Sequence, residues 1–239
     1  MSIELRNVTK RVRMGAVKVT YENLNIRVEQ DSRVAFLGHK EAGLEAIVKL
    51  ICAADAPDRG TVTRTHSISW PIPSSVFLSK HLPLCANARF IARLYEADEP
   101  SYLARLAELG DLGKFMNQRA DDCPNEIRSL FCFAAGVLLP FDHYILTNLN
   151  VGKKAERERV GEIVDDLRQR AGLLLVTHDV KPAQQFCDQA YVFDEGRATF
   201  YDDVDAAVEH FGTIAAKDEA DEDSMDFEPE LESLVNEDF

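Results

Sequence analysis

The sequence feature that most constrains the fold of this chain is a short apolar run that ends in glycine. A loop and an amphipathic stretch follow this run. Val34-Ala-Phe-Leu is wholly apolar, as expected of a buried parallel strand, and it stops at Gly38. A loop through Gly43 leads into residues 44–53, whose apolar side chains have helical spacing. A buried strand, a glycine-containing loop and a helix in this order are the layout of a phosphate-binding loop.

Further strands and helices alternate along the chain, which predicts an α/β fold with a mixed sheet covered by helices. Buried strands are expected at 144–146 and 173–176, around a charged helix at 154–170. A closing hairpin over 190–201 and a helix over 204–211 complete this core. Alternating residues near the N-terminus predict a small antiparallel β subdomain with one wet face, from strands at 3–8, 17–21 and 24–28.

The middle of the chain has helical patterns without an intervening strand signal. Phe90, Ile91, Leu94 and Tyr95 would share one helical face, and a second such face follows within residues 103–109. An apolar helix is expected over 127–139. We therefore predict a helical subdomain, about 87–140, inserted into one domain that spans residues 1–216.

Charge is distributed unevenly between this domain and the C-terminal end. The net charge is −14, and residues 217–239 contain eleven acids and one lysine, a contribution of −10, which leaves −4 for the rest. Two interpretations of this tail remain open: a solvated, disordered extension, or a docking segment in which Phe227, Leu231, Leu234, Val235 and Phe239 interleave the acids. A chain without a basic patch is not expected to bind nucleic acid.

The remaining composition favours a cytoplasmic protein. The longest apolar-rich run, 131–141, is too short to span a bilayer, and the N-terminus lacks the pattern of a signal peptide. Five cysteines without a C-x-x-C pair are expected to be reduced thiols, and no metal site is predicted.

Several motifs resemble those of ABC transporter ATP-binding subunits. Pro57-Asp-Arg-Gly-Thr-Val resembles the turn that follows the phosphate-loop helix in that family, and Leu175-Val-Thr-His-Asp resembles its switch-histidine strand. Ile68-Ser-Trp-Pro and the segment 87–95 are similar to the ATPases of capsular-polysaccharide export. The resemblance covers residues 2–212 and implies an ABC ATPase-like core. It also implies permease partners in the inner membrane and a head-to-tail dimer of ATPase subunits.

The phosphate loop departs from this family at its middle glycine, its lysine and its hydroxyl residues. The expected pattern G-x-x-G-x-G-K-[ST]-[ST] is replaced by Gly38, His39, Lys40, Glu41, Ala42, Gly43, Leu44, Glu45 and Ala46. The phosphate-gripping lysine is Leu44, the Mg²⁺-holding hydroxyl is Glu45 and a loop glycine is Glu41. Carboxylates beside a polyanion oppose its binding, by about 4 kcal/mol for a like-charge pair at about 4 Å. Two compensations remain open: Glu45 could help to coordinate a cation, or Lys40 could replace the lost lysine.

The other positions that the resemblance implies have also changed. The Asp-Glu pair that supports Mg²⁺ and orients water is Thr147 and Asn148, of which Asn148 could position a water without acting as a base. Only the switch histidine, His178, remains, and a structural role under the Thr177–Asp179 turn is expected for it. The aromatic that stacks on adenine would fall near Val12, and the coupling glutamine near Ser79.

The signature loop, which should approach the partner's γ-phosphate through glycines, reads Cys123-Pro124-Asn125-Glu126. Pro124 removes a backbone donor and Glu126 adds a carboxylate where phosphate should enter. Because proline is favoured at the start of a helix, we expect a helix to follow, with a role in packing alone.

These losses predict a pseudo-ATPase, which is a scaffold or regulatory subunit of a polysaccharide exporter on the cytoplasmic face of the inner membrane. It would pair with itself or with an intact ATPase, and it would need no cofactor. One alternative is a working ATP-binding subunit with an atypical site, in which Lys40, Lys153 and Lys154 bind Mg-ATP. A second is a free-standing interaction protein that meets no permease. A groove for the permease is expected between the core and the helical subdomain, near residues 79–87.

Overall fold

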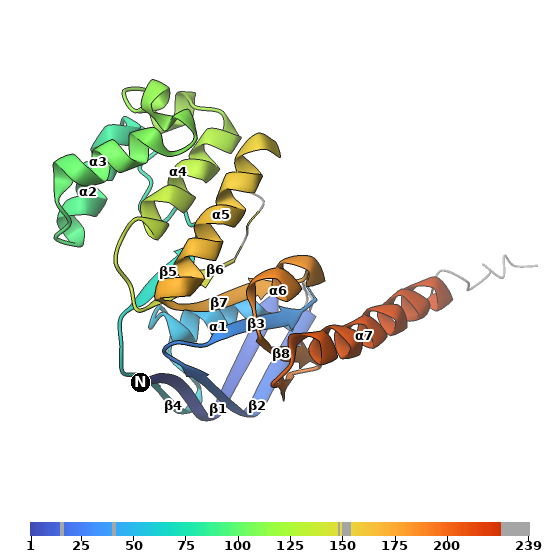
Figure 1. Cartoon of the computed structure of the whole chain (residues 1–239). Helices are drawn as coiled ribbons and strands as arrows, with labels where there is room; N and C mark the ends of the chain where they lie inside the picture. Colours follow the sequence, from blue (N-terminus) through green and yellow to red (C-terminus); the bar gives the residue numbers. More distant parts are fainter. Residues whose placement is uncertain (15–16, 40–41, 148, 150–153, 226–239) are drawn as a thin grey trace, which may run out of the picture.

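The structure, a computed structural model, describes residues 1–14, 17–39, 42–147, 149 and 154–225. It has the predicted α/β fold, with a six-stranded mixed sheet, a three-stranded antiparallel sheet and a separate layer of helices (Figure 1). None of the helices in these ranges is long and apolar enough to cross a membrane.

The six-stranded sheet has the order β5-β6-β7-β3-β8-β9. Neighbouring strands are parallel except β8 and β9, which form the predicted hairpin. The central strands are buried on both faces, which explains their continuous apolar sequences. The strands are β3 (Arg33–Gly38), β5 (Ile68–Ile72), β6 (His143–Leu146), β7 (Gly172–Thr177), β8 (Gln189–Asp194) and β9 (Arg197–Tyr201).

The smaller sheet has the order β2-β1-β4, with β1 at Ser2–Met14, β2 at Val17–Glu29 and β4 at Arg59–Arg64. The prediction of two separate strands over 17–28 was wrong, because β2 continues through Asn23. Asn23 adopts φ 53, a left-handed conformation that asparagine tolerates, and the β1–β2 register shifts nearby. The chain therefore absorbs the irregularity within one strand.

Three helices and two 3₁₀ turns form the helical layer in the upper part of Figure 1. The predicted helical region between 87 and 118 is divided, because Glu96 adopts φ 53 and Asp98 then caps a new helix through the Ser101 N–H. The elements are α2 (Leu84–Leu94), α3 (Glu99–Glu108), the turns Leu109–Phe115 and Ala120–Asp122, and α4 (Asn125–Val137).

The remaining helices pack near the sheets: α1 (Leu44–Ile51), α5 (Lys154–Arg170), α6 (Val180–Phe186) and α7 (Val204–Met225). The last helix was predicted to end at residue 211, and α7 instead continues past the proposed boundary at 216. Figure 1 shows its C-terminal part projecting from the body. The tail over 217–239 was predicted to be disordered as one interpretation; residues 217–225 are instead helical, and 226–239 fall outside the described residues.

The hydrophobic core is divided by the central sheet into two clusters. Leu37 and Leu175 face the cluster that includes the helical layer, whereas Phe36 and Val176 face the cluster beneath the small sheet. This is the period-two alternation of a strand. All five cysteines are free thiols, as predicted.

Candidate functional site

The phosphate-loop segment, residues 38–46, begins at the C-terminal end of β3 and is held by side chains from other elements. The buried Tyr21 of β2 donates its hydroxyl hydrogen bond to the carbonyl oxygen of Ala42. The His39 ring stacks on Phe211 of α7, with 4.8 Å between ring centroids. Lys40 and Glu41 lie outside the described residues. Side-chain contacts therefore hold the loop on both sides of Lys40 and Glu41, at His39 and at Ala42.

Leu44, at the position of the expected lysine, is buried in the core. Its side chain is 8% exposed and shares a cluster with Phe36 and Phe193. A Cβ built on Gly38 would lie 3.2 Å from the Leu44 Cδ1 atom, so the leucine fills the space next to the end of β3. Gly43 precedes it at φ 74, a conformation that favours glycine. A buried aliphatic group cannot bind a phosphate.

Glu45 occupies the first turn of α1. Its carboxylate is 2.7 Å from the ammonium of Lys49, one turn later, and its side chain is 79% exposed. An acidic residue there is stabilised by the free N–H groups and dipole of the helix start. The Glu45 carboxylate is thus the anion at the start of α1, where an anion is favoured.

Thr147, at the first position of the lost acidic pair, bonds to the neighbouring strand. Its backbone N–H donates to the Ile72 carbonyl oxygen at 2.8 Å, and its hydroxyl lies 3.3 Å from the same oxygen. A hydroxyl cannot act as a base at this position. Asn148, the second position, is outside the described residues.

His178 is exposed, and the prediction that it supports the Thr177–Asp179 turn was wrong. The Thr177 hydroxyl accepts the Asp179 N–H at 2.9 Å, and the Asp179 carboxylate caps α6 through the Lys181 N–H. These side chains hold the turn without the histidine. His178 and Thr147 both line a cavity of about 310 Å³, so the structure does bring these two predicted positions together.

The signature position begins α4 in the helical layer. Pro124 is the N-cap, and Asn125 and Glu126 are exposed. The Arg128 guanidinium donates to the carbonyl oxygens of Cys123, at 2.6 Å, and Ala120, at 3.2 Å. Behind this start, the helix buries an apolar face from Ile127 to Val137, as a packing role requires.

The candidate positions divide into two groups in space. One group lies at the carboxyl ends of the neighbouring strands β3, β6 and β7. It consists of the phosphate-loop segment, Thr147 and His178, which follow these strands in that order. The start of α4 lies in the helical layer above (Figure 1). In the described ranges no three His, Cys, Asp or Glu side chains are placed to hold a metal ion.

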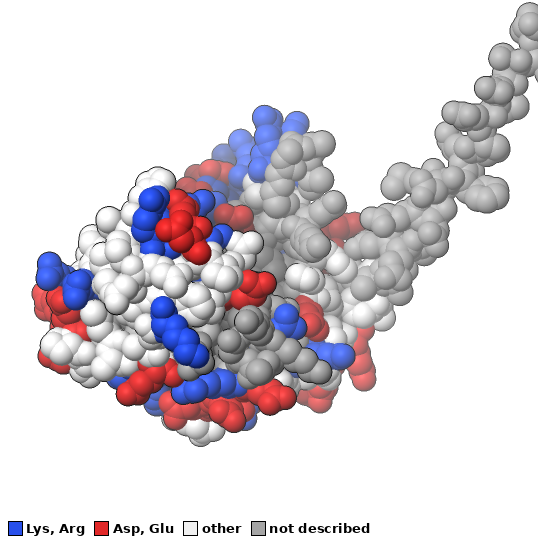
Figure 2. Space-filling view, turned by 90° about the horizontal axis from the view of Figure 1, so that it is seen from above, with Lys and Arg blue, Asp and Glu red and all other residues white. Residues whose placement is uncertain are grey.

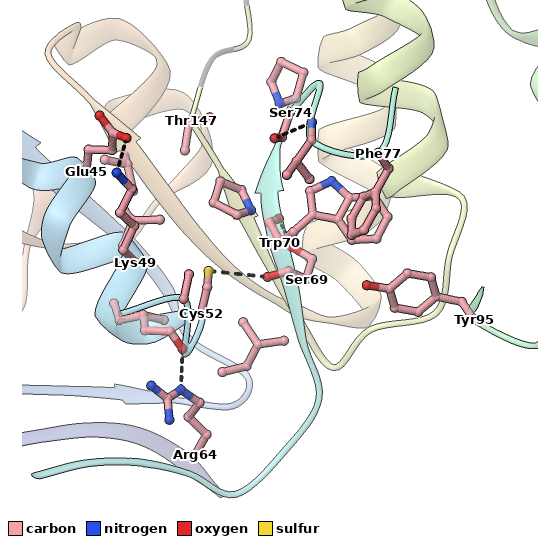
Figure 3. Close-up of a pocket in the computed structure, with 18 of the residues that line it drawn as sticks. Glu45, Lys49, Cys52, Arg64, Ser69, Trp70, Ser74, Phe77, Tyr95 and Thr147 are labelled. Carbon is pink, nitrogen blue, oxygen red and sulfur yellow. Dashed lines mark hydrogen bonds and ion pairs between the residues drawn. The ribbon is translucent and has the colours of Figure 1, made fainter. Parts of the chain in front are cut away.

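A larger cavity, of about 830 Å³, lies beside α1 and was not predicted from the sequence (Figure 3). Trp70 packs against Phe77, at 4.8 Å between centroids, and against Tyr95, at 5.2 Å. Glu45, Lys49 and Cys52 line the opposite wall, where burial raises the pKa of the Cys52 thiol to about 11. The presence of a single tryptophan was the one sequence signal for this site.

A groove for the permease was predicted near residues 79–87, but no residue of this range lines the cavity. Asn87 is buried, and its side-chain amide accepts the Ser79 N–H at 2.7 Å and donates to the Ser79 carbonyl oxygen at 3.1 Å. These hydrogen bonds join the two ends of the predicted range to each other. The cavity lies against the residues that flank it, Phe77 and Tyr95.

Charged side chains on the face seen from above do not form a continuous basic surface. Among the coloured residues, Lys and Arg lie in small groups between acidic and uncharged side chains (Figure 2). Nucleic-acid phosphates require clustered cations. This face therefore gives no support for nucleic-acid binding.

Curated relatives of this chain include ATP-binding proteins of polysialic acid transport and of capsule polysaccharide export. The polysialic acid transport ATP-binding protein KpsT of Escherichia coli is 28% identical over 211 residues, covering 86% of this chain and 96% of the relative. The chain is a homologue of capsule polysaccharide export ABC ATP-binding proteins. The capsule polysaccharide export ATP-binding protein CtrD of Neisseria meningitidis serogroup B is 26% identical over 215 residues, covering 89% and 99%.

Solved structures give the same ABC ATPase fold for this homologue. An ATP-binding subunit of an ABC transporter matches with a TM-score of 0.72 at 20% identity, covering 89% of this chain and 94% of that one. The dimeric ABC cassette MJ0796, bound to ADP and Pi, matches with a TM-score of 0.68 at 17% identity, covering 82% and 96%. No protein-family model matches the chain.

Proposed function

We propose that this ABC-type subunit retains the fold and docking surfaces of a polysaccharide exporter component without binding or hydrolysing ATP. The observation that carries the proposal is the start of α1, where Leu44 is buried in the core and Glu45 is paired with Lys49. Both the cation and the hydroxyl that would bind Mg-ATP are replaced there. The chain would act as a scaffold or regulatory subunit.

The expected partners are permease subunits at the cytoplasmic face of the inner membrane, with a homodimer or a heterodimer that contains an intact ATPase. Surface composition supports a docking role. Of the seven large apolar side chains exposed in the described part of the chain, five lie between residues 76 and 95, namely Val76, Leu82, Phe90, Leu94 and Tyr95. Exposed apolar side chains favour a protein interface where they lie together, and Val76 and Tyr95 line the same cavity.

Isothermal titration with Mg-ATP tests the lost chemistry. We expect no heat of binding up to millimolar nucleotide, because a buried leucine and a carboxylate stand where the cation and hydroxyl are needed. The Escherichia coli KpsT relative, titrated identically, is the positive control. Micromolar binding by this chain would favour the alternative, a working site that uses Lys40, Lys153 and Lys154.

Affinity purification from detergent-solubilised membranes tests the docking role. We expect the tagged chain to recover a permease, and Phe90→Asp to reduce that recovery at least about ten-fold, since a buried carboxylate opposes an apolar contact. Phe200→Asp is the matched control, because Phe200 is similarly exposed, 46% against 54%, but lies on β9. Recovery only from the soluble fraction, without a permease, would instead indicate a free-standing interaction protein.

A further inference from the structure

The cavity beside Trp70 is formed largely by a segment that lacks acids. Residues 59–95 contain no Asp or Glu and five bases, Arg59, Arg64, Lys80, Arg89 and Arg93, although the whole chain has 41 acids and a net charge of −14. Arg64 and His66 line the cavity itself, and on α1 Lys49 faces it together with the paired Glu45. An acidic occupant would meet little repulsion here.

The walls of the cavity favour an occupant with bulky apolar side chains. Trp70, Phe77 and Tyr95 offer aromatic faces and edges on one side (Figure 3), and Val76, at the rim, is 72% exposed.

The C-terminal segment of the chain has the matching chemistry. Residues 226–239 contain six acids and no Lys or Arg, and five bulky apolar residues lie between them. Leu231, Leu234 and Val235 have the i, i+3, i+4 spacing of side chains that enter a groove together. We propose that residues 226–239 of one copy occupy the cavity beside Trp70 in a second copy.

The course of α7 determines which copy receives the segment. The C-terminal part of α7 projects from the body (Figure 1), and the fourteen residues that follow α7 can extend to at most about 50 Å. Because α7 leaves the body, we assign the segment to the cavity of a neighbouring copy. Reciprocal exchange in a twofold dimer fills both cavities and closes the assembly.

The segment would also cover Val76 and Tyr95, two of the exposed apolar side chains, because both line the cavity. If these side chains contact a permease, which rests on the proposed function, the two occupants exclude each other. The acidic segment then acts as a displaceable cover, and self-association and permease docking compete.

Sedimentation velocity on full-length chains, combined with emission from Trp70, the single tryptophan, tests this exchange. The cavity variant is Val76→Asp, with Val76→Lys as its control of opposite charge at the same exposed position. The segment variant carries Leu231→Ser, Leu234→Ser and Val235→Ser. Val76 is 72% exposed, so its substitution leaves the buried core unchanged.

We expect wild type and Val76→Lys to dimerise as concentration rises around about 10 µM, with a blue shift of Trp70 emission. The cavity and segment variants should each dimerise at least about ten-fold more weakly. Their equimolar mixture should associate better than either alone, because it combines an intact cavity with an intact segment.

Three results would overturn the exchange: a wild type that stays monomeric, association that neither variant weakens, or a concentration-independent Trp70 shift in monomers, which would place the segment on its own chain. Permease recovery by the wild type alongside any of these results would leave the proposed function standing. Loss of permease recovery with intact exchange would remove only the proposed function.

Discussion

Replacing Gly172 with alanine is expected to destabilise the protein by about 3 kcal/mol or more. Gly172 begins β7, and a Cβ there would lie 2.0 Å from the Gln30 carbonyl oxygen and 2.3 Å from the His143 Nδ1 atom. The carbonyl belongs to backbone and cannot move aside. For a domain of this size the melting temperature should fall by about 10 °C, measured by calorimetry.

Two other glycines provide controls for this substitution. A Cβ on Gly161 would meet only the Phe186 ring, at 4.0 Å, and one on Gly212 would meet nothing within 4 Å. Both lie in helices, so alanine there should be neutral or stabilise by up to about 1 kcal/mol. Equal melting temperatures for all three variants would contradict the packing described at Gly172.

Acid should destabilise the fold through His143, which is fully buried on β6. Burial, with a smaller contribution from the charge of His66, lowers the pKa of His143 to about 4. The unfolded residue titrates near its ordinary value of 6.5, so the unfolded state binds the proton first. Stability is therefore retained above about pH 6.5 and falls by about 3 kcal/mol as pH drops towards 4.

Urea unfolding at a series of pH values measures this dependence. His143→Phe should flatten the decline between pH 6.5 and 4, whatever its effect on stability at neutral pH. His66, whose pKa burial also lowers, contributes in the same direction, while the Asp142 carboxyl has a lowered pKa and responds at more acidic pH. An unaltered slope in His143→Phe would disprove the assignment.

The strands that were predicted correctly are those whose sequences reflect burial on both faces. β3, β6 and β7 are short apolar runs, and no other element of that length would bury every side chain. β4 was missed because Arg59–Arg64 is an edge strand with exposed or half-buried residues. β5 contains Pro71, which normally argues against a strand and is tolerated here because β5 is at the sheet edge.

The residues of the candidate site could be named from sequence, but their surroundings could not. The identity of Leu44 shows that a lysine is missing, whereas its burial beside Gly38 depends on the packing of β3, β8 and α1. The cavity beside Trp70 was harder still to predict. Its walls come from α1, β5, the following loop and Thr147, which are distant in sequence and have no shared motif.

The contacts that hold residues 38–46 also limit which single substitutions the chain can accept. Returning lysine at position 44 alone would force an ammonium group into an apolar core, at a cost of several kcal/mol. Freeing the loop would further require the loss of the Tyr21 hydrogen bond to Ala42 and of the stack of His39 on Phe211. Each of these single changes is thus expected to lower the stability of the chain. A lysine at position 44 would need compensating changes in the residues that pack around it.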